Sequence, residues 1–398
     1  MARLFSSGFE LNSTAARMEW TNVSGSPTIS STTVRSGGYA CRIVSLSSGT
    51  PKYFSQQVLG SGATANVCYI RFYLYVNTLP SAANTIFYIS GGLGTAGLIK
   101  LTSSGALQLF NNTSQVGSDS SNLSTGTWYR VEIYQDKSGS AGSHVLTARI
   151  DGTNFASSSS LTLADGAHDI YLGGNTKSEA QTVGEWFFDD VAINDNTGSY
   201  QNSWPGDGKI IHLRPNAAGD NTDWTGYAGS GSNYERVDEV TPDDNTSGVR
   251  SFTTDQIDDY NVEASGLSSS DTINVVSVGF RANRSTGTTS STFNVRLKDS
   301  SGGTVTESST FSADTTTWRT HTTASNATTP YPIISYTRPD GSNAWTNSYL
   351  DTAQIGAKIV SGSGDRYVQI SALWMLVDYG AGTPPASSVK NMALLGVG

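Results

Sequence analysis

Charged residues are scarce in this sequence, and their scarcity narrows the class of protein. Only 14% of the residues are charged, against about 25% in an average globular protein. Ser, Thr, Gly and Asn take their place. Disordered chains combine such polarity with few aromatic residues and high net charge, but here aromatic residues reach 10%. The composition therefore favours a folded β protein with polar, uncharged strand faces and many turns.

Basic clusters, long apolar runs and an export signal are also missing. The net charge of −9 argues against a nucleic-acid partner, because binding a phosphate backbone requires clustered Lys and Arg. No stretch approaches the roughly 18 apolar residues of a membrane span, so we expect none. Residues 1–8 contain no apolar core of signal-peptide length. We therefore expect synthesis in a cytoplasm, without export by the usual route.

Cysteine is nearly absent, with two residues in the chain. Cys68 belongs to an alternating run and shares its apolar face with Ile70 and Phe72, and Cys41 shares a face with Ile43. Cysteine packs as a small hydrophobe, and a cytosolic product rarely carries disulfides. We predict two buried free thiols, with a Cys41–Cys68 disulfide as the alternative.

Helical periodicity is missing as well, and period-two alternation in short runs between Gly, Ser, Asn and Asp clusters replaces it. The runs expected to form strands are 66–76, 85–90, 98–102, 106–111, 128–135, 144–150, 169–172, 185–194, 209–213, 272–281, 292–297, 304–311, 318–323, 353–359 and 366–379. Many short strands without helices indicate sandwiches or barrels. We predict an all-β protein of two tandem antiparallel β-sandwich (jelly-roll) domains with a short C-terminal tail.

Turn-forming residues without sustained alternation divide the chain. We expect a first domain at 1–196, a linker at 197–209 and a second domain at 210–380. Within the second domain, residues 214–262 look like loop with only short elements. The apolar run at 367–379 is the longest in the chain and suits a central strand.

The last segment, 381–398, consists of a Gly/Pro/Ser linker and an apolar tail. One interpretation is a frayed end, or a segment folded back on its own domain. The alternative is an anchor that docks on a neighbouring subunit. The candidate partner-binding residues of that anchor are Val389, Met392, Leu394, Leu395 and Val397.

An ordered series of short motifs resembles a known family. The N-terminal half resembles the concanavalin A-like, laminin-G-type jelly roll common in tailed-bacteriophage virion proteins. The matching pieces are Ser-Gly-Phe-Glu at 7–10, Trp-Tyr-Arg-Val-Glu-Ile at 128–133, Ala-Arg-Ile-Asp-Gly at 148–152 and Phe-Phe-Asp-Asp-Val-Ala-Ile-Asn-Asp at 187–195. The continuation, from Ser-Trp-Pro-Gly-Asp-Gly at 203–208 into the second domain, is similar to an arrangement in such proteins. The resemblance implies a jelly-roll fold, a structural role in the virion and synthesis in a host bacterial cytoplasm.

Because folds of this kind include glycoside hydrolases, we searched the sequence for a pair of catalytic carboxylates. The expected Glu-x-Asp-x-x-Glu pattern is absent, and Glu185 with Asp189 and Asp190 does not reproduce it. The four histidines are isolated, and no phosphate loop or Gly-x-Ser-x-Gly elbow occurs. We therefore expect no enzymatic activity.

Two adjacent aspartates, Asp189 and Asp190, lie in a strand-like run and need partners. Alternation from Phe187 places Asp189 on the apolar face with Val191. The expected role is that of an acceptor for backbone N–H groups of an adjacent loop. The alternative is that the two aspartates bind a calcium ion together with Asp195, and we expect no other cofactor. The acidic stretches 238–245 and 255–259 are expected to be solvated surface, and Tyr69, Tyr73 and Tyr75 to be outward residues covered by loops of their own domain.

These observations lead to a functional expectation. We expect a non-enzymatic structural accessory protein of a tailed-phage virion, such as a capsid decoration or head-fibre subunit, with a tail-associated subunit as a close variant. Its partners would be other virion proteins and copies of itself, with a trimer as the common arrangement for such subunits. The alternative is a lectin-like adhesin that binds host-surface glycans, although fold alone does not establish such a role.

Overall fold

The computed structural model describes residues 2–45, 51–59, 63–174, 182–285, 291–313, 316–320, 331–362, 364 and 366–382. Nearly all of the regular structure is β-strand. The described residues contain one four-residue α-helix, α1 (Asn347–Leu350), and one 3-10 turn, η1 (Tyr234–Arg236). No described helix has the length and hydropathy needed to span a membrane. The predicted fold class, two tandem antiparallel sandwiches, is confirmed.

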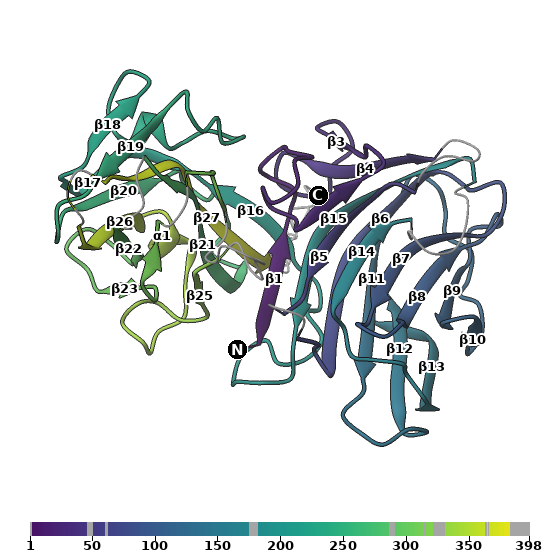
Figure 1. Ribbon diagram of the computed structural model, residues 1–398. Coiled ribbons are helices and arrows are strands. Elements are labelled where there is room, and N and C mark those ends of the chain that lie inside the picture. The colour runs from purple at the N-terminus through teal and green to yellow at the C-terminus, as the bar shows by residue number, and fades with distance from the viewer. Residues whose placement is uncertain are drawn as a thin grey trace, which may run out of the picture.

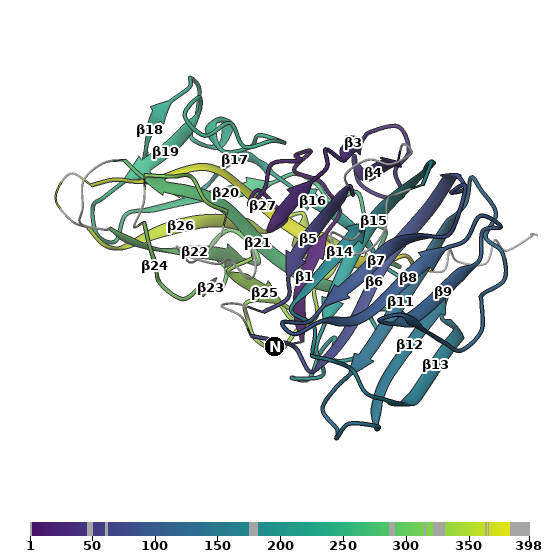
Figure 2. The same ribbon diagram turned by 45° about the vertical axis from the view of Figure 1, so that its right-hand side comes forward.

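Two antiparallel sheets form the first sandwich (Figure 1). Sheet A has the order β13 (Thr153–Leu161), β12 (His144–Ile150), β11 (Trp128–Asp136), β6 (Val67–Thr78), β15 (Gly184–Asn194), β4 (Ala40–Ser45) and β3 (Thr28–Ser30), with β1 (Arg3–Ser7) also paired to β15. Sheet B has the order β10 (Ser114–Val116), β9 (Leu107–Asn111), β8 (Thr95–Leu101), β7 (Asn84–Ser90), β14 (Asp169–Gly173), β5 (Tyr53–Gln57) and β2 (Asn22–Ser24). The strands cross the sandwich as two twisted layers (Figure 2).

The core of the first sandwich lies between these two sheets, because alternate side chains of each strand point inward. Phe72 of β6 stacks on Phe87 of β7 with ring centroids 5.1 Å apart, which ties sheet A to sheet B. Cys41 and Cys68 are fully buried in the same core, and both are free thiols. The prediction of buried free cysteines is therefore confirmed.

The second sandwich has the same plan with two further sheets. Sheet C has the order β18 (Thr225–Ala228), β19 (Gly248–Ser251), β27 (Val368–Gly380), β21 (Thr272–Arg284) and β25 (Ile333–Ser335), with β16 (Lys209–Leu213) also paired to β27. Sheet D has the order β17 (Pro215–Thr222), β20 (Ile257–Val262), β26 (Gln354–Ser361), β22 (Thr292–Lys298) and β23 (Val305–Glu307), with β24 (Phe311–Ser312) also paired to β22. Phe280 and Phe293 meet edge to face between the two sheets. The run predicted to be a central strand is β27, the middle of sheet C.

The two sandwiches lie side by side, with β1 and β16 between them (Figure 1). A separate apolar cluster forms there. Leu11 and Met18 of the first half pack with Ile210, Trp374 and Leu376 of the second half. The outer face of β27 is thus buried against the first sandwich, which explains why this strand is apolar on both faces.

Three expectations are corrected in the second half. Residues 214–262 carry only short elements, as expected, but four of these are strands that belong to sheets C and D, so the segment is part of the sandwich and is not simply loop. The stretch 255–259 is not a solvated surface, since Asp258 and Asp259 are fully buried, and Asp259 accepts a hydrogen bond from Arg296. Arg319, in the run predicted as a strand at 318–323, makes one isolated bridge to Ala282, and residues 321–323 of that run lie outside the described ones.

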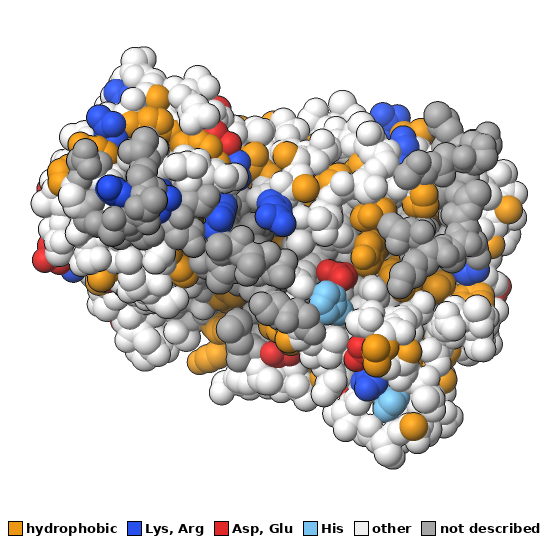
Figure 3. All heavy atoms as spheres, viewed as in Figure 1, with side chains coloured by type: hydrophobic (Ala, Val, Ile, Leu, Met, Phe, Trp, Pro, Cys, Tyr) orange, Lys and Arg blue, Asp and Glu red, His pale blue; other side chains and the backbone are white. Residues whose placement is uncertain are grey.

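Charged side chains are sparse and scattered on the face shown in Figure 3, much of which is polar and uncharged. This agrees with the 14% charged content of the chain. Such a surface keeps a protein hydrated without a strong field of one sign. A place where charged side chains gather with aromatic ones is therefore a place to look for a binding site.

Candidate functional site

Four neighbouring strands of sheet A place one side chain each in a row across its outer face. Arg42 of β4 lies opposite Phe187 of β15, Phe187 opposite Tyr75 of β6, and Tyr75 opposite Trp128 of β11. The Tyr75 ring is 5.7 Å from Phe187, edge to face, and 5.4 Å from Trp128. We call these four residues the cross-strand row.

A hollow of about 500 Å³ opens beside the Arg42 end of this row. Its lining residues are mostly hydroxyl-bearing or polar: Ile29, Ser30, Ser31, Thr32, Thr33, Arg42, Asn77, Glu185 and Phe187. Arg42 Nε donates to Glu185 Oε1 at 2.6 Å, and Asn77 Nδ2 donates to Glu185 Oε2. The Arg42 side chain is still 43% exposed. We call this site the Glu185 hollow.

A β-bulge in β15 determines which residues reach this face. Asp190 has φ +50°, and the register with β6 shifts between Asp189 and Ala192. The extra residue reverses the alternation, because two residues of β15 there oppose one of β6. Phe187 and Asp189 therefore point outward, whereas Val191 belongs to the core. The expectation that Asp189 shares the apolar face with Val191 is wrong for this reason.

Both aspartates of the bulge bind the loop at 35–36. Asp189 Oδ2 accepts the Arg35 backbone N–H at 2.8 Å, the acceptor role that was predicted. Asp190 Oδ2 accepts from Arg35 Nη1 at 2.6 Å. Burial raises the pKa of both carboxyl groups, and the charge of Asp190 raises that of Asp189 further.

The candidate calcium ligands do not form one cluster. Asp195 accepts from the backbone and hydroxyl of Thr197 instead of facing Asp189. Among the described residues, no group of three or more His, Cys, Asp or Glu side chains is placed to hold a metal ion. The predicted partner-binding residues Val389, Met392, Leu394, Leu395 and Val397 lie outside the described residues.

The interdomain segment crosses the other half of the outer face of sheet A. Trp204 lies against Tyr69 and Tyr134, and Arg149 lies 3.6 Å above its ring. Asp207 accepts a hydrogen bond from the Tyr73 hydroxyl, and Tyr73 is buried. Loops of the first domain were predicted to cover the outward tyrosines. Tyr73 is indeed covered, but by the segment that precedes β16.

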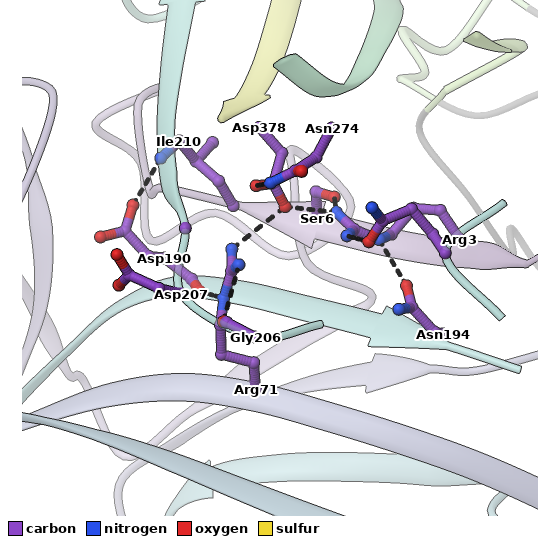
Figure 4. Close-up of polar contacts among 12 residues, drawn as sticks. Arg3, Ser6, Arg71, Asp190, Asn194, Gly206, Asp207, Ile210, Asn274 and Asp378 are labelled. Carbon is purple, nitrogen blue, oxygen red and sulfur yellow. Dashed lines mark hydrogen bonds and ion pairs between the residues drawn. The ribbon is translucent and has the colours of Figure 1, made fainter. Parts of the chain in front are cut away.

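Polar contacts then join this face to the second sandwich (Figure 4). Arg71 of β6 donates to the backbone carbonyls of Asp190 and Gly206 and binds Asp378 of β27. Asp190 Oδ1 accepts the backbone N–H of Ile210 at 2.6 Å. The face is consequently sealed at this end and accessible at the Glu185 hollow.

The hollow combines groups that suit a hydroxyl-rich ligand. Glu185 only accepts hydrogen bonds, Arg42 only donates them, and Asn77 does both. The half-buried rings of Tyr75 and Trp128 add aromatic surface further along the same row, whereas Phe187, next to the trio, is buried. A concave site with convergent polar groups and aromatic walls is typical of small-ligand binding. Among its lining residues the only carboxylate is Glu185, whereas glycoside hydrolysis by the common route needs two.

The sequence analysis considered Glu185 only as a catalytic carboxylate, and it did not identify its partners Arg42 and Asn77 or Trp128 at the far end of the row. These residues are far apart in the chain, and each occupies an outward position of an alternating run, as many other residues do. The signal that links them is the register of four strands, which no local pattern contains.

No family model and no curated protein matches the chain. Solved structures with a similar fold each match about half of it. The cellulose-induced protein Cip1 has 15% identity and a TM-score of 0.37, covering 51% of this chain and 99% of its own. A carbohydrate esterase from the Shiga toxin-encoding bacteriophage phi24B has 15% identity and a TM-score of 0.37, covering 50% and 100%. The alginate lyase Aly36B has 13% identity and a TM-score of 0.34, covering 48% and 96%.

These comparisons correct one expectation. We expected no enzymatic activity, but the structures similar to this chain include a carbohydrate esterase, alginate lyases and a sialidase. The fold therefore gives no ground for excluding catalysis. At such low identity the similarity describes the fold and assigns no reaction.

Proposed function

We propose that this chain is a glycan-recognition protein, and that the Glu185 hollow with the adjoining cross-strand row is its sugar-binding site. The observation that carries this proposal is the hydrogen-bonded trio of Arg42, Glu185 and Asn77 beside Phe187 at the end of the row. Sugars present hydroxyl groups around their rims and C–H groups on their faces. The trio can hydrogen-bond to the hydroxyl groups, and the aromatic rings can pack against the C–H faces.

The position of the trio on rigid strands supports the proposal. Arg42, Asn77 and Glu185 belong to three consecutive strands of sheet A, β4, β6 and β15, and Glu185 is held from two sides. A carboxylate that is fixed in place loses little side-chain entropy when it binds a ligand. Acceptors and donors are therefore already placed for hydroxyl groups.

We further propose that the chain acts at the surface of a tailed-phage particle, as a capsid decoration or head-fibre subunit or as a tail-associated subunit. The support is the ordered motif series from residue 7 to residue 208, which resembles tailed-phage virion proteins. Sugar recognition there would attach particles to glycans of the bacterial surface. Other virion proteins and further copies of the chain, for instance in a trimer, would be its partners.

Binding is tested with a panel of bacterial-surface and plant oligosaccharides by isothermal titration calorimetry. We expect saturable binding, and a loss of affinity of about ten-fold or more for Glu185→Ala, because a hydrogen bond to a charged group is removed. Asn77→Ala, at an exposed position, should weaken binding with little effect on folding. Asp255→Asn is the matched control, since Asp255 pairs with Lys358 in the second sandwich. Absence of binding across the panel, or equal affinity of Glu185→Ala and wild type, contradicts the proposal.

The same samples are analysed for released or shortened sugars, because the fold does not exclude catalysis. The virion assignment has a separate test. Antibodies against the chain should label purified particles in electron microscopy, and the chain should co-purify with capsid or tail proteins. Its presence in lysates but not on particles would contradict the assignment without affecting sugar binding.

A further inference from the structure

Among the described residues, the arginines near the Glu185 hollow are each paired with a carboxylate of the same neighbourhood. Arg42 pairs with Glu185 at 2.6 Å. One row further along the strands, Arg35 pairs with Asp190 at 2.6 Å and with Asp207 at 3.0 Å. No arginine of this group is left to balance an anionic ligand.

Arg130, two residues after Trp128 on β11, is likewise paired with carboxylates. Its Nε lies 3.3 Å from Glu132 Oε2, and its Nη1 lies 3.9 Å from Asp207 Oδ1. A carboxylate, sulfate or phosphate on a sugar would approach these existing anions, Glu185 above all. Repulsion between like charges over a few ångströms opposes such an approach, and the chain's net charge of −9 adds to it.

The covered half of the face limits the direction in which a ligand can lie. Tyr73, one row below Tyr75 on β6, is buried, and the Arg35 guanidinium lies 3.2 Å above its ring. A sugar chain running along the strands would collide with Arg35 and the segment around Asp207. A chain running across the strands would instead follow the cross-strand row, in which Arg42, Tyr75 and Trp128 are partly exposed, whereas Phe187 is buried beneath the hollow that it lines.

The length of the row follows from sheet geometry. Arg42 and Trp128 are on β4 and β11, which are separated by β15 and β6. Three strand spacings of about 4.8 Å give roughly 14 Å, the length of about three linked hexoses. The row ends at Trp128, the first residue of β11.

We propose that the site selects neutral glycans over uronate-, sialate- or sulfate-bearing ones, and that the glycan lies across the strands from Arg42 to Trp128 over about three hexose units. This inference rests on the proposed sugar-binding function and names its ligand class. The ion pair of Arg42 and Glu185 serves as the selector: Arg42 supplies donors to hydroxyl groups, while Glu185 removes the excess positive charge that would attract an acid.

Charge selection is tested with gluco-, manno- and galacto-configured trisaccharides and their counterparts oxidised at C6 to hexuronates. For the configuration that binds, we expect the neutral form to bind wild type about ten-fold more tightly than the oxidised form. Glu185→Gln keeps the shape and removes the negative charge, so the ratio should fall to about three-fold or less. Asp255→Asn is the control and should leave the ratio unchanged.

Three results would be decisive against these ideas. Tighter binding of the oxidised sugar, with binding still dependent on Glu185, overturns the charge selection and leaves the sugar-binding function intact. An unchanged ratio in Glu185→Gln also overturns the selection. Absence of binding for both sugar forms overturns the proposed function together with this inference.

Orientation is tested with a series from monosaccharide to hexasaccharide. Affinity should rise up to about three units and then level off. Trp128→Ala should weaken the trisaccharide and leave the monosaccharide, which binds at the Arg42 end, unchanged. Trp318→Ala removes an indole from the second sandwich and should affect neither. An affinity that rises steadily to six units, or an equal loss for monosaccharide and trisaccharide in Trp128→Ala, overturns the proposed orientation.

Discussion

Arg71 Nη2 of the first sandwich lies 3.1 Å from Asp378 Oδ2 of the second, and neither side chain is exposed to solvent. Arg3 Nη1 binds the same carboxylate oxygen at 2.5 Å, and Asn274 donates to the other oxygen. Figure 4 shows these groups converging between the two sandwiches. Two arginines and one aspartate are thus buried together, and removing one partner leaves the others uncompensated.

Asp378→Ala should therefore destabilise the whole chain. It leaves Arg3 and Arg71 buried without their shared carboxylate, and breaking such a pair costs about 3–5 kcal/mol. Urea unfolding followed by tryptophan fluorescence measures the loss. The control, Asp255→Ala, removes a carboxylate that is 76% exposed and should change the free energy of unfolding by about 0.5 kcal/mol or less. A loss below about 1 kcal/mol for Asp378→Ala would contradict the role assigned to this network.

Acid should weaken the same network. Burial tends to raise the pKa of Asp378, but Arg71 and Arg3 outweigh it and hold that pKa below its ordinary value. A carboxyl group with a lowered pKa stabilises the fold above its unfolded pKa of about 3.9, and the contribution is lost as the pH falls through the folded pKa. Wild type should thus lose more stability between pH 5 and about pH 3 than Asp378→Asn. Parallel losses in the two proteins would show that another group causes the acid lability.

The buried thiols give a simple chemical prediction. Burial raises the pKa of both Cys41 and Cys68 above that of a free thiol, and nearby aspartates raise it further. Because the thiolate is the reactive form, both residues should resist a thiol reagent in the native protein at neutral pH. After denaturation both should react. Rapid labelling of the native protein at either position would contradict their placement in the core.

Strand positions were the part of the fold that the sequence predicted well. The run at 144–150 is β12 and the run at 209–213 is β16, both with identical bounds. Alternation of side chains is a local property of a half-buried strand, so a single sequence contains it. In residues 214–262 the sequence did not reveal β17, because this strand is rich in Asp, Asn and Gly, which are uncommon in strands, and pairing with β20 overrides that preference.

The candidate site was much harder to predict. The bulge at Asp190 inverts the alternation of β15, and nothing near residue 190 in the sequence marks that inversion. The partners of Glu185 come from β4 and β6, more than 100 residues away in the chain. A site made by the register of distant strands depends on tertiary pairing, which local patterns do not specify.

Glu19 should make the protein more stable in mild acid than in base. Burial raises the pKa of Glu19 to about 8, although a hydrogen bond with Ser7 acts in the opposite direction. A carboxyl group with a raised pKa contributes stability that is complete below its unfolded pKa of about 4.3 and is lost as the pH rises toward the folded value. Wild type should therefore lose a few kcal/mol between about pH 5 and pH 8.

Glu19→Gln replaces the carboxyl group by a neutral amide and should remove much of this slope. Part of the slope should remain, because burial also raises the pKa of Glu10 to about 7. Urea unfolding of wild type and variant at the two pH values measures the difference. Identical slopes would show that Glu19 is not the group responsible.

Gly208 tests whether the buried network between the sandwiches tolerates a small displacement. A Cβ at this position would overlap the Arg71 guanidinium and lie 2.8 Å from Asp378 Oδ1. The end of an arginine side chain normally moves aside, but this one is held by Asp378 and by the carbonyls of Asp190 and Gly206. Gly208→Ala should therefore cost about 1–3 kcal/mol, the usual range for overpacking. Gly380→Ala is the control, since its nearest contact would be 3.8 Å away. Equal stability of both variants would mean that Arg71 can leave Asp378 at little cost, and that the remaining contacts between the sandwiches, such as Arg3 with Asp378 and the apolar cluster around Trp374, are sufficient to hold them together.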